Sequence, residues 1–184
     1  MTTNHGHKTV QALLYFCNEA HKTDSLGSLR RSTATAWLFF ADIAHLCTYG
    51  RTISGDSYMR TAIGFDLVGT RKLLDNTYGY VNTPDVTYSR KYLNVTPDDI
   101  RARSDDQDLD EFSESDIQML TSVYFAYHRF PIAQLHDIMR TFPGWRRARI
   151  NSIVPPGFFL ANASDRAKER FNSAHVLNSN NYTW

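Results

Sequence analysis

The feature that most constrains this chain is the segment over residues 36–58, which reads AWLFFADIAHLCTYGRTISGDSY. Its first half is apolar on nearly every helical face and carries one carboxylate and one imidazole, Asp42 and His45. A helix that is apolar all round is buried by its neighbours, and this one is too short and too interrupted to span a bilayer. Gly50 follows it, and glycine takes the left-handed conformation that ends helices at least cost. The segment therefore predicts a buried central helix that ends at a glycine bend.

Most of the remaining apolar residues recur at helical spacing, with polar or glycine-containing segments between them. We predict helices over residues 9–20, 28–49, 65–78, 114–129, 131–141, 145–150 and 164–175. Ser113 and Asp116 form a capping-box pattern at the start of the fourth of these helices. Residues 80–95 are rich in Val, Thr and Tyr and contain a proline in turn-like company, which favours a short β-hairpin. The expected fold is mainly α: a compact helical bundle around the buried central helix, with a small β-hairpin insertion.

The length of 184 residues and an ordinary globular composition predict one domain. We expect this domain over residues 1–176, with an acidic loop at about residues 97–111 and a C-terminal tail over residues 177–184. The N-terminus has no apolar stretch typical of a signal peptide, so a cytoplasmic location is expected. A net charge of +1 gives no general reason to bind a membrane or nucleic acid.

Asp42 and His45 are the first candidates for chemistry, because residues three apart share one face of a helix. They could act as a base and its orienting partner, as a hydrolase needs, but no G-x-S-x-G nucleophile elbow accompanies them. The alternative is a structural polar cluster with the turn Ser54-Gly55-Asp56, in which Asp42 or Asp56 accepts backbone N–H groups.

The sequence predicts no metal site and no cofactor. The histidines show no paired ligand spacing, and the glycines form no phosphate-binding loop. Cys17 and Cys47 lie in apolar helical patterns, which indicates reduced buried thiols more readily than a disulfide or a metal pair. Trp145, Arg146 and Arg147 form a basic turn with an aromatic residue, which can contact phosphates or dock onto an acidic protein.

The central segment also resembles the signature of a known family. Residues 38–42, LFFAD, with His45, and then residues 50–58, GRTISGDSY, are similar to the pattern LLYFADxxH…GRPITGDxY of the Panacea domain, the family of SocA-like antitoxins. Residues 112–124 resemble the family's FSEEE segment, and Pro143-Gly144-Trp145 stands where the family has PAW. The resemblance covers most of the chain, about residues 10–150.

The chain departs from the family pattern at Thr52, Phe65 and Arg140, which points to a divergent branch carried by a phage or prophage. The resemblance implies a mainly α-helical bundle with a small β element and no catalytic activity. Family members are antitoxins that bind an unrelated toxin encoded beside them. SocA-like members can also present the toxin to a ClpXP-type protease as an adaptor.

Residues and resemblance together lead to a first hypothesis: a cytoplasmic, antitoxin-like protein-binding domain that neutralises a toxin by direct contact, with or without a protease. Under this hypothesis Asp42, His45, Asp56 and Tyr58 hold the fold or line the groove for the partner. The partner is a protein toxin, no membrane partner is expected, and a homodimer is left open.

The basic turn has its own place in these hypotheses. In the first, Trp145 anchors an apolar contact, with Arg146 and Arg147 on its rim. The alternative is a phage or prophage regulator that binds a host protein or nucleic acid through residues 145–149. A third hypothesis is a hydrolase that uses Asp42 and His45, and it requires both side chains to face a solvent-open pocket.

Overall fold

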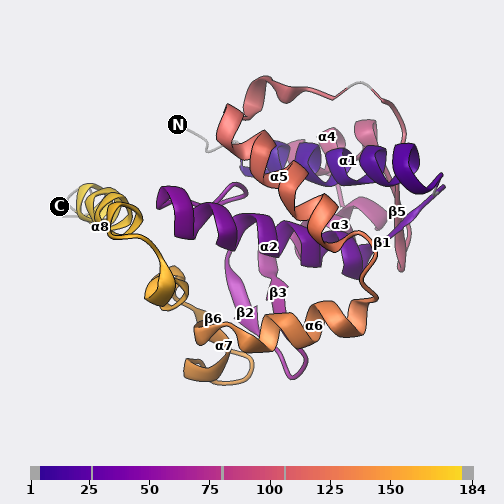
Figure 1. Ribbon diagram of the computed structural model, residues 1–184. Coiled ribbons are helices and arrows are strands. Elements are labelled where there is room, and N and C mark those ends of the chain that lie inside the picture. Colours follow the sequence, from indigo (N-terminus) through magenta and orange to yellow (C-terminus); the bar gives the residue numbers. More distant parts are fainter. Residues whose placement is uncertain (1–4, 26, 80, 106, 180–184) are drawn as a thin grey trace.

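The computed structural model describes residues 5–25, 27–79, 81–105 and 107–179, and most of them are helical (Figure 1). The helices are α1 (His5–Asp24), α2 (Arg31–Tyr49), α3 (Val68–Tyr78), α4 (Pro84–Tyr92), α5 (Glu114–Tyr127), α6 (Ile132–Thr141), α7 (Pro143–Arg147) and α8 (Asp165–Ser179), with the 3-10 helices η1 (Leu109–Glu111) and η2 (Pro156–Asn162). The strands are β1 (Leu29–Arg30), β2 (Tyr58–Arg60), β3 (Phe65–Leu67), β4 (Leu93–Val95), β5 (Asp99–Ala102) and β6 (Ile153–Val154). The predicted class, mainly α with a minor β part, is confirmed.

Helix α2 is the central element, and α1, α5, α6 and α8 pack around it (Figure 1). Its side chains are buried without a break from Ala36 to Ile43, on every side of the helix. The helix ends at Gly50, which has a φ of +80° and donates its N–H to the carbonyl of Leu46. A Cβ at Gly50 would lie 2.6 Å from the carbonyl oxygen of Ala167 in α8. This position therefore requires glycine for its conformation and for the close approach of α8.

Aromatic rings fill the space between α2, β3 and η2. Phe39 stacks on Phe65 with 4.8 Å between ring centroids, and it meets Phe159 edge-on at 5.9 Å. The other rings in contact with Phe39 belong to Phe40, Tyr58 and Phe142. This cluster joins the central helix to segments that lie far along the chain.

Two small antiparallel sheets are built from short strands, in the orders β1-β5-β4 and β3-β2-β6. In the second sheet, Tyr58 of β2 lies opposite Leu67 of β3 on one side and Val154 of β6 on the other. All three side chains are buried. The bend that follows α2 is thus fixed by a strand from the C-terminal third of the chain.

The β-hairpin predicted over residues 80–95 is wrong, because Pro84–Tyr92 forms helix α4. Thr83 caps this helix by accepting the N–H of Val86, and Pro84 lies in the first turn, where its missing N–H leaves no partner unsatisfied. Val86 and Tyr92 are buried and α4 packs against α1 and α3, so packing outweighs the strand preference of these residue types. Strand pairing begins only after α4, where β4 pairs with β5.

Other predicted boundaries shift as well. Helix α3 starts at Val68, so residues 65–67 form strand β3 rather than a first helical turn. Helix α7 starts at Pro143 and not at the predicted residue 145, so Pro143 and Gly144 lie inside a helical turn. The predicted acidic loop contains β5 and η1. Helix α8 runs to Ser179, and residues 180–184 of the predicted tail lie outside the described residues.

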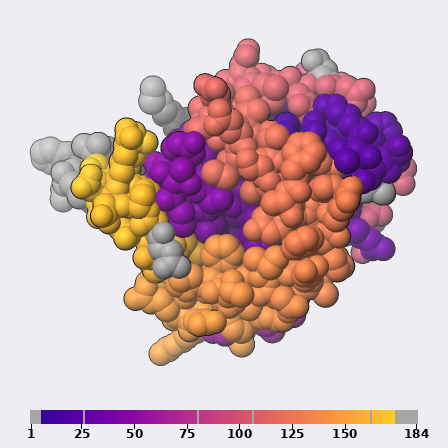
Figure 2. Space-filling view, in the orientation of Figure 1, coloured from indigo at the N-terminus to yellow at the C-terminus, as the bar shows by residue number. Residues whose placement is uncertain are grey.

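One strip of α2 reaches the surface between α5 and α8 (Figure 2). Ala44 and Cys47 are half-buried on α2, and Thr48 is exposed.

None of the described helices combines the length and the apolar character needed to cross a bilayer.

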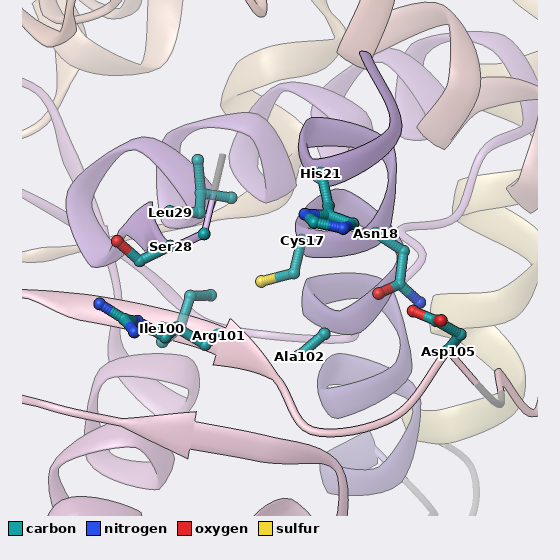
Figure 3. A pocket seen from close by; sticks show the side chains of 10 residues that line it. Cys17, Asn18, His21, Ser28, Leu29, Ile100, Arg101, Ala102 and Asp105 are labelled. Carbon is teal, nitrogen blue, oxygen red and sulfur yellow. The ribbon is translucent and has the colours of Figure 1, made fainter. Parts of the chain in front are cut away.

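A cavity of about 180 Å³ lies between α1 and the sheet that contains β5 (Figure 3). Cys17, Arg101 and Asp105 line it, together with Asn18, whose side-chain oxygen is buried without a hydrogen-bond partner. Both cysteines are free thiols, as predicted. Burial raises the pKa of Cys17 to about 12 and also raises the pKa of the half-buried Cys47, so neither is an activated nucleophile.

Candidate functional site

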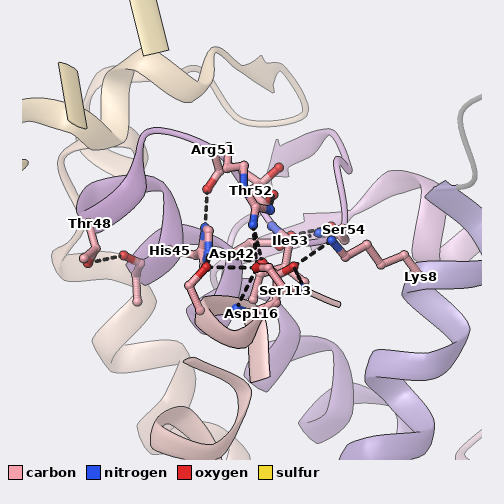
Figure 4. A network of polar contacts seen from close by, with 12 residues as sticks. Lys8, Asp42, His45, Thr48, Arg51, Thr52, Ile53, Ser54, Ser113 and Asp116 are labelled. Atoms are coloured by element: carbon pink, nitrogen blue, oxygen red, sulfur yellow. Dashed lines mark hydrogen bonds and ion pairs between the residues drawn. The ribbon is translucent and has the colours of Figure 1, made fainter. Parts of the chain in front are cut away.

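Asp42 is the polar centre of the bend that follows α2 (Figure 4). Its side chain is fully buried on α2, and one carboxylate oxygen accepts the backbone N–H groups of Ile53 and Ser54, each at 2.8 Å. The other oxygen accepts the hydroxyl of Ser54 and the hydroxyl of Tyr58, the latter at 3.0 Å. Burial raises the pKa of Asp42 to about 6, although these four donors lower it. At neutral pH the carboxylate is therefore ionised and fully occupied in shaping the bend.

Asp56 does a similar task for the helix that comes next. Its carboxylate accepts the backbone N–H groups of Gly69 and Thr70, each at 2.7 Å, and the Thr70 hydroxyl at 2.7 Å. These donors belong to the first turn of α3, where N–H groups lack partners within the helix and favour a negative charge. A Cβ at Gly69 would lie 2.9 Å from an Asp56 oxygen, so the glycine allows this close approach. Asp56 thus caps α3 from outside the helix.

His45 belongs to a second polar cluster, separate from that of Asp42. Its Nδ1 lies 2.8 Å from the carbonyl oxygen of Arg51, which can only accept, so Nδ1 carries the proton in the neutral ring. Its Nε2 lies 3.1 Å from the hydroxyl of Ser115 and 3.1 Å from an Asp116 oxygen. Burial lowers the pKa of His45, so the ring is neutral and Nε2 accepts from Ser115.

Asp116 is the centre of this second cluster and is fully buried. One of its oxygens lies 2.9 Å from the Arg51 guanidinium, and the other lies 2.8 Å from the Lys8 ammonium. Asp116 also completes the predicted capping box, since it accepts the N–H of Ser113 at 3.0 Å while Ser113 accepts its N–H in return. Burial raises the pKa of Asp116, but Lys8, the Ser113 N–H and Arg51 together hold it below its usual range. An ionised Asp116 therefore ties together α1, the bend and the start of α5.

The two residues proposed as base and orienting partner do not act as a pair. Asp42 bonds to residues of the bend, whereas His45 bonds to Arg51 and Ser115 and lies beside Asp116. Both side chains have no exposed surface, so the solvent-open pocket that the hydrolase hypothesis requires is not formed around them. Among the described residues, no group of three or more His, Cys, Asp or Glu side chains is placed to hold a metal ion.

The basic turn lies on α7, away from both clusters. Trp145 is half-buried, and the Arg60 guanidinium lies 4.2 Å from its ring centroid. Arg146 and Arg147 are exposed, and the Arg147 guanidinium lies 4.9 Å from the ring of Phe158. One face of the Trp145 ring is thus covered by the chain's own Arg60, and Arg147 lies against Phe158.

Two residues of the second cluster escaped the sequence analysis as site residues. Asp116 was identifiable only as a cap, because its sequence neighbours give no sign that it is buried. Lys8 lies 108 positions away from Asp116, and nothing local to either residue indicates that the two meet. The residue type gives no signal either, because α1 also carries the charged residues Glu19, Lys22 and Asp24.

The fold and the polar clusters define a small, mainly α-helical domain whose signature residues bond within the chain. The chain belongs to the family described as antitoxin SocA-like, Panacea domain, whose sequence profile matches residues 37–146. The match contains Asp42, His45, Asp56, Tyr58 and Asp116. Comparisons with curated proteins and with solved structures gave no match. An antitoxin-like role with a toxin as partner is therefore what the family indicates, and the resemblance expected from the sequence is confirmed.

Proposed function

We propose that this protein is a cytoplasmic antitoxin that neutralises a protein toxin by direct binding and does no chemistry itself. Membership of the SocA-like antitoxin family is the observation that carries the proposal. The internal bonding of Asp42, His45 and Asp116 supports it, because the polar residues of the signature serve the fold and are not free to act on a substrate. The exposed surface is then left for recognition of a partner.

Co-expression with the product of the neighbouring reading frame tests this proposal. We expect that product alone to arrest growth, and the pair to restore growth and to co-elute as a stable complex in size-exclusion chromatography. The matched control is an unrelated toxin, which this chain should not neutralise. A neighbouring product that neither harms the host nor binds this chain would contradict the proposal.

The adaptor form of this function adds a protease. If the chain presents the toxin to a ClpXP-type protease, the toxin should disappear faster after a translation block when the chain is present, and only in cells that hold the protease. Equal toxin half-lives in cells with and without the protease, while growth is still restored, would leave direct binding as the mechanism.

A second candidate function rests on the exposed arginines of α7 and the residues after it. Arg146, Arg147 and Arg149 are all exposed, and such a cluster suits a phage or prophage regulator that binds a host protein or nucleic acid. A mobility shift that weakens with salt and is abolished by Arg146→Ala with Arg147→Ala would favour the nucleic-acid form. Absence of a shift at low salt would reject it.

A further inference from the structure

An apolar groove of about 360 Å³ runs between α2 and α5, and we name it the α2–α5 groove. Phe40, Ala44 and Cys47 of α2 form one wall, and Met119 and Ala126 of α5 belong to the other. No charged side chain lines it among the described residues. The exposed strip of α2 in Figure 2 lies beside this groove, so the groove opens to solvent.

The two walls have the spacing of helix faces. On α2 the lining residues are four and three positions apart, and on α5 they recur at the same spacing, so both walls run along helix axes. Phe40 and Val123 are buried and form the floor, whereas Ser122 and Ala126 are exposed and form the rim. An elongated apolar groove between two helices is the shape that receives a third, amphipathic helix.

The outer surface of α5 gives a second, independent sign. No residue from Ile117 to Tyr127 carries a formal charge, although the helix faces solvent at Gln118, Ser122 and Phe125. Phe125 is 58% exposed. A helix face that is both exposed and uncharged is typical of a surface that a partner covers, since a solvated face is usually charged.

Charge around the groove indicates the kind of helix that fits. Helix α7 directly follows Phe142, and Arg146, Arg147 and Arg149, in and just after this helix, are all exposed. Arg146 is exposed and follows Phe142, a lining residue, by one helical turn. The partner helix should therefore carry acidic residues on the side that faces this basic border.

We propose that the α2–α5 groove binds an amphipathic helix of the toxin, with its apolar stripe against Phe40, Cys47 and Ala126 and its acidic residues toward Arg146. The proposal rests on the proposed function and names the surface and the kind of toxin segment that it uses. In this arrangement the buried polar clusters fix the positions of α2 and α5, and the groove between these helices binds the partner.

Ser122→Trp tests the groove directly, because it places a bulky ring on an exposed rim position whose hydroxyl donates only within α5, to the carbonyl of Gln118, among the bonds of the described residues. We expect affinity for the purified neighbouring toxin to fall by about 30-fold, because the ring would occupy the groove and keep the partner from its apolar floor. Thr87→Trp is the matched control, since Thr87 is exposed on α4, which packs against α1 and α3. The control should change affinity by less than about 3-fold, and circular dichroism should show both variants folded.

Two further measurements test the orientation of the helix. Arg146→Glu should weaken toxin binding by about 10-fold at low salt and by less at high salt, because salt screens the attraction. The Cys47 thiol should react with a maleimide more slowly when the toxin is bound, while the buried Cys17 serves as an unreactive reference.

Each outcome bears on one of the two proposals. A toxin that binds wild type and Ser122→Trp equally would overturn the groove and leave the antitoxin function standing. A toxin that does not bind wild type at all would remove both. If this chain forms a dimer that Ser122→Trp dissociates, a second copy occupies the groove and the proposal is overturned. If Cys47 reacts with maleimide only after residues 180–184 are deleted, the chain's own C-terminus occupies the groove, which also overturns the proposal.

Discussion

Asp42 offers the sharpest test of how the central bend is held, because its carboxylate is fully buried and accepts four donors. Asp42→Ala leaves the N–H groups of Ile53 and Ser54 without an acceptor, and each unsatisfied buried donor costs about 1–3 kcal/mol. Asp42→Asn keeps an oxygen for both N–H groups, and its amide can donate to the hydroxyl of Tyr58. The alanine variant should therefore be about 4 kcal/mol less stable than the asparagine variant at any pH.

The stability of the wild type relative to these two variants should change with pH. Burial raises the pKa of Asp42 from 3.8 to about 6, so between these values the folded state binds more protons than the unfolded state. Stability therefore falls as the pH rises through this window, by about 3 kcal/mol at about 1.4 kcal/mol per pH unit. Near pH 4 the wild type should match Asp42→Asn within about 1 kcal/mol, and above pH 7 it should be less stable than Asp42→Asn by about 2–3 kcal/mol.

Urea unfolding followed by tryptophan fluorescence and circular dichroism, at pH 4.5 and pH 7.5, measures these differences. Comparison with Asp42→Asn cancels the titration of other groups, such as His45. A wild type that is more stable than Asp42→Asn at pH 7.5 would show that the four donors outweigh burial, and would refute the reasoning. Equal stabilities of the alanine and asparagine variants would refute the assigned hydrogen bonds.

Three other substitutions test single features of the fold. Gly50→Ala should lower the free energy of unfolding by at least about 2 kcal/mol, because the left-handed conformation disfavours a side chain and the Cβ would meet the Ala167 carbonyl; an unchanged melting temperature would contradict this close approach. Asp56→Ala should cost about 1–2 kcal/mol and speed amide exchange in the first turn of α3 before other helices, whereas uniform exchange would argue against a cap. Because the pKa of Asp116 is lowered, its stabilising contribution should be present above about pH 4 and lost as the pH falls further, and Lys8→Met should shrink that loss in denaturation series between about pH 2 and 5; an acid profile unchanged by Lys8→Met would contradict the ion pair.

Local chemistry explains which parts of the fold the sequence predicts well. The buried helix α2 and its end at Gly50 follow from an apolar segment and one glycine, both of which act within a few residues. The capping box at the start of α5 is equally local, since Ser113 and Asp116 bond to each other across one turn.

Helix α4 shows where local signals mislead. Thr83-Pro84 fits both a turn between strands and the start of a helix, and the valine, threonine and tyrosine residues that follow favour strands. The helix wins because Val86 and Tyr92 pack against α1 and α3, contacts that depend on the whole fold. Strand preference reflects the surroundings of a residue, and these cannot be read from a short segment.

In the polar clusters, too, the contacts within a short segment could be predicted from the sequence and the distant ones could not. The sequence predicts that Asp42 or Asp56 accepts backbone N–H groups at the bend. Asp42 accepts those of Ile53 and Ser54 there, whereas Asp56 accepts those of Gly69 and Thr70 at the start of α3. The sequence could not show that His45 turns away from Asp42 toward Asp116, or that Lys8 neutralises Asp116 from the opposite end of the chain. Such pairs are set by the packing of helices that are distant in sequence.

The dependence of Asp116 on Lys8 has a practical consequence for the expression of this chain. The recognised block, residues 37–146, excludes α1, β6 and η2, yet Phe16, Val154 and Phe159 are among the most deeply buried side chains. A chain trimmed to that block would expose apolar side chains of α2 to solvent. It would also leave the buried Asp116 carboxylate without the Lys8 ammonium. Boundaries drawn from the sequence match are therefore too narrow for expression of this chain, which should be cloned with both flanks intact.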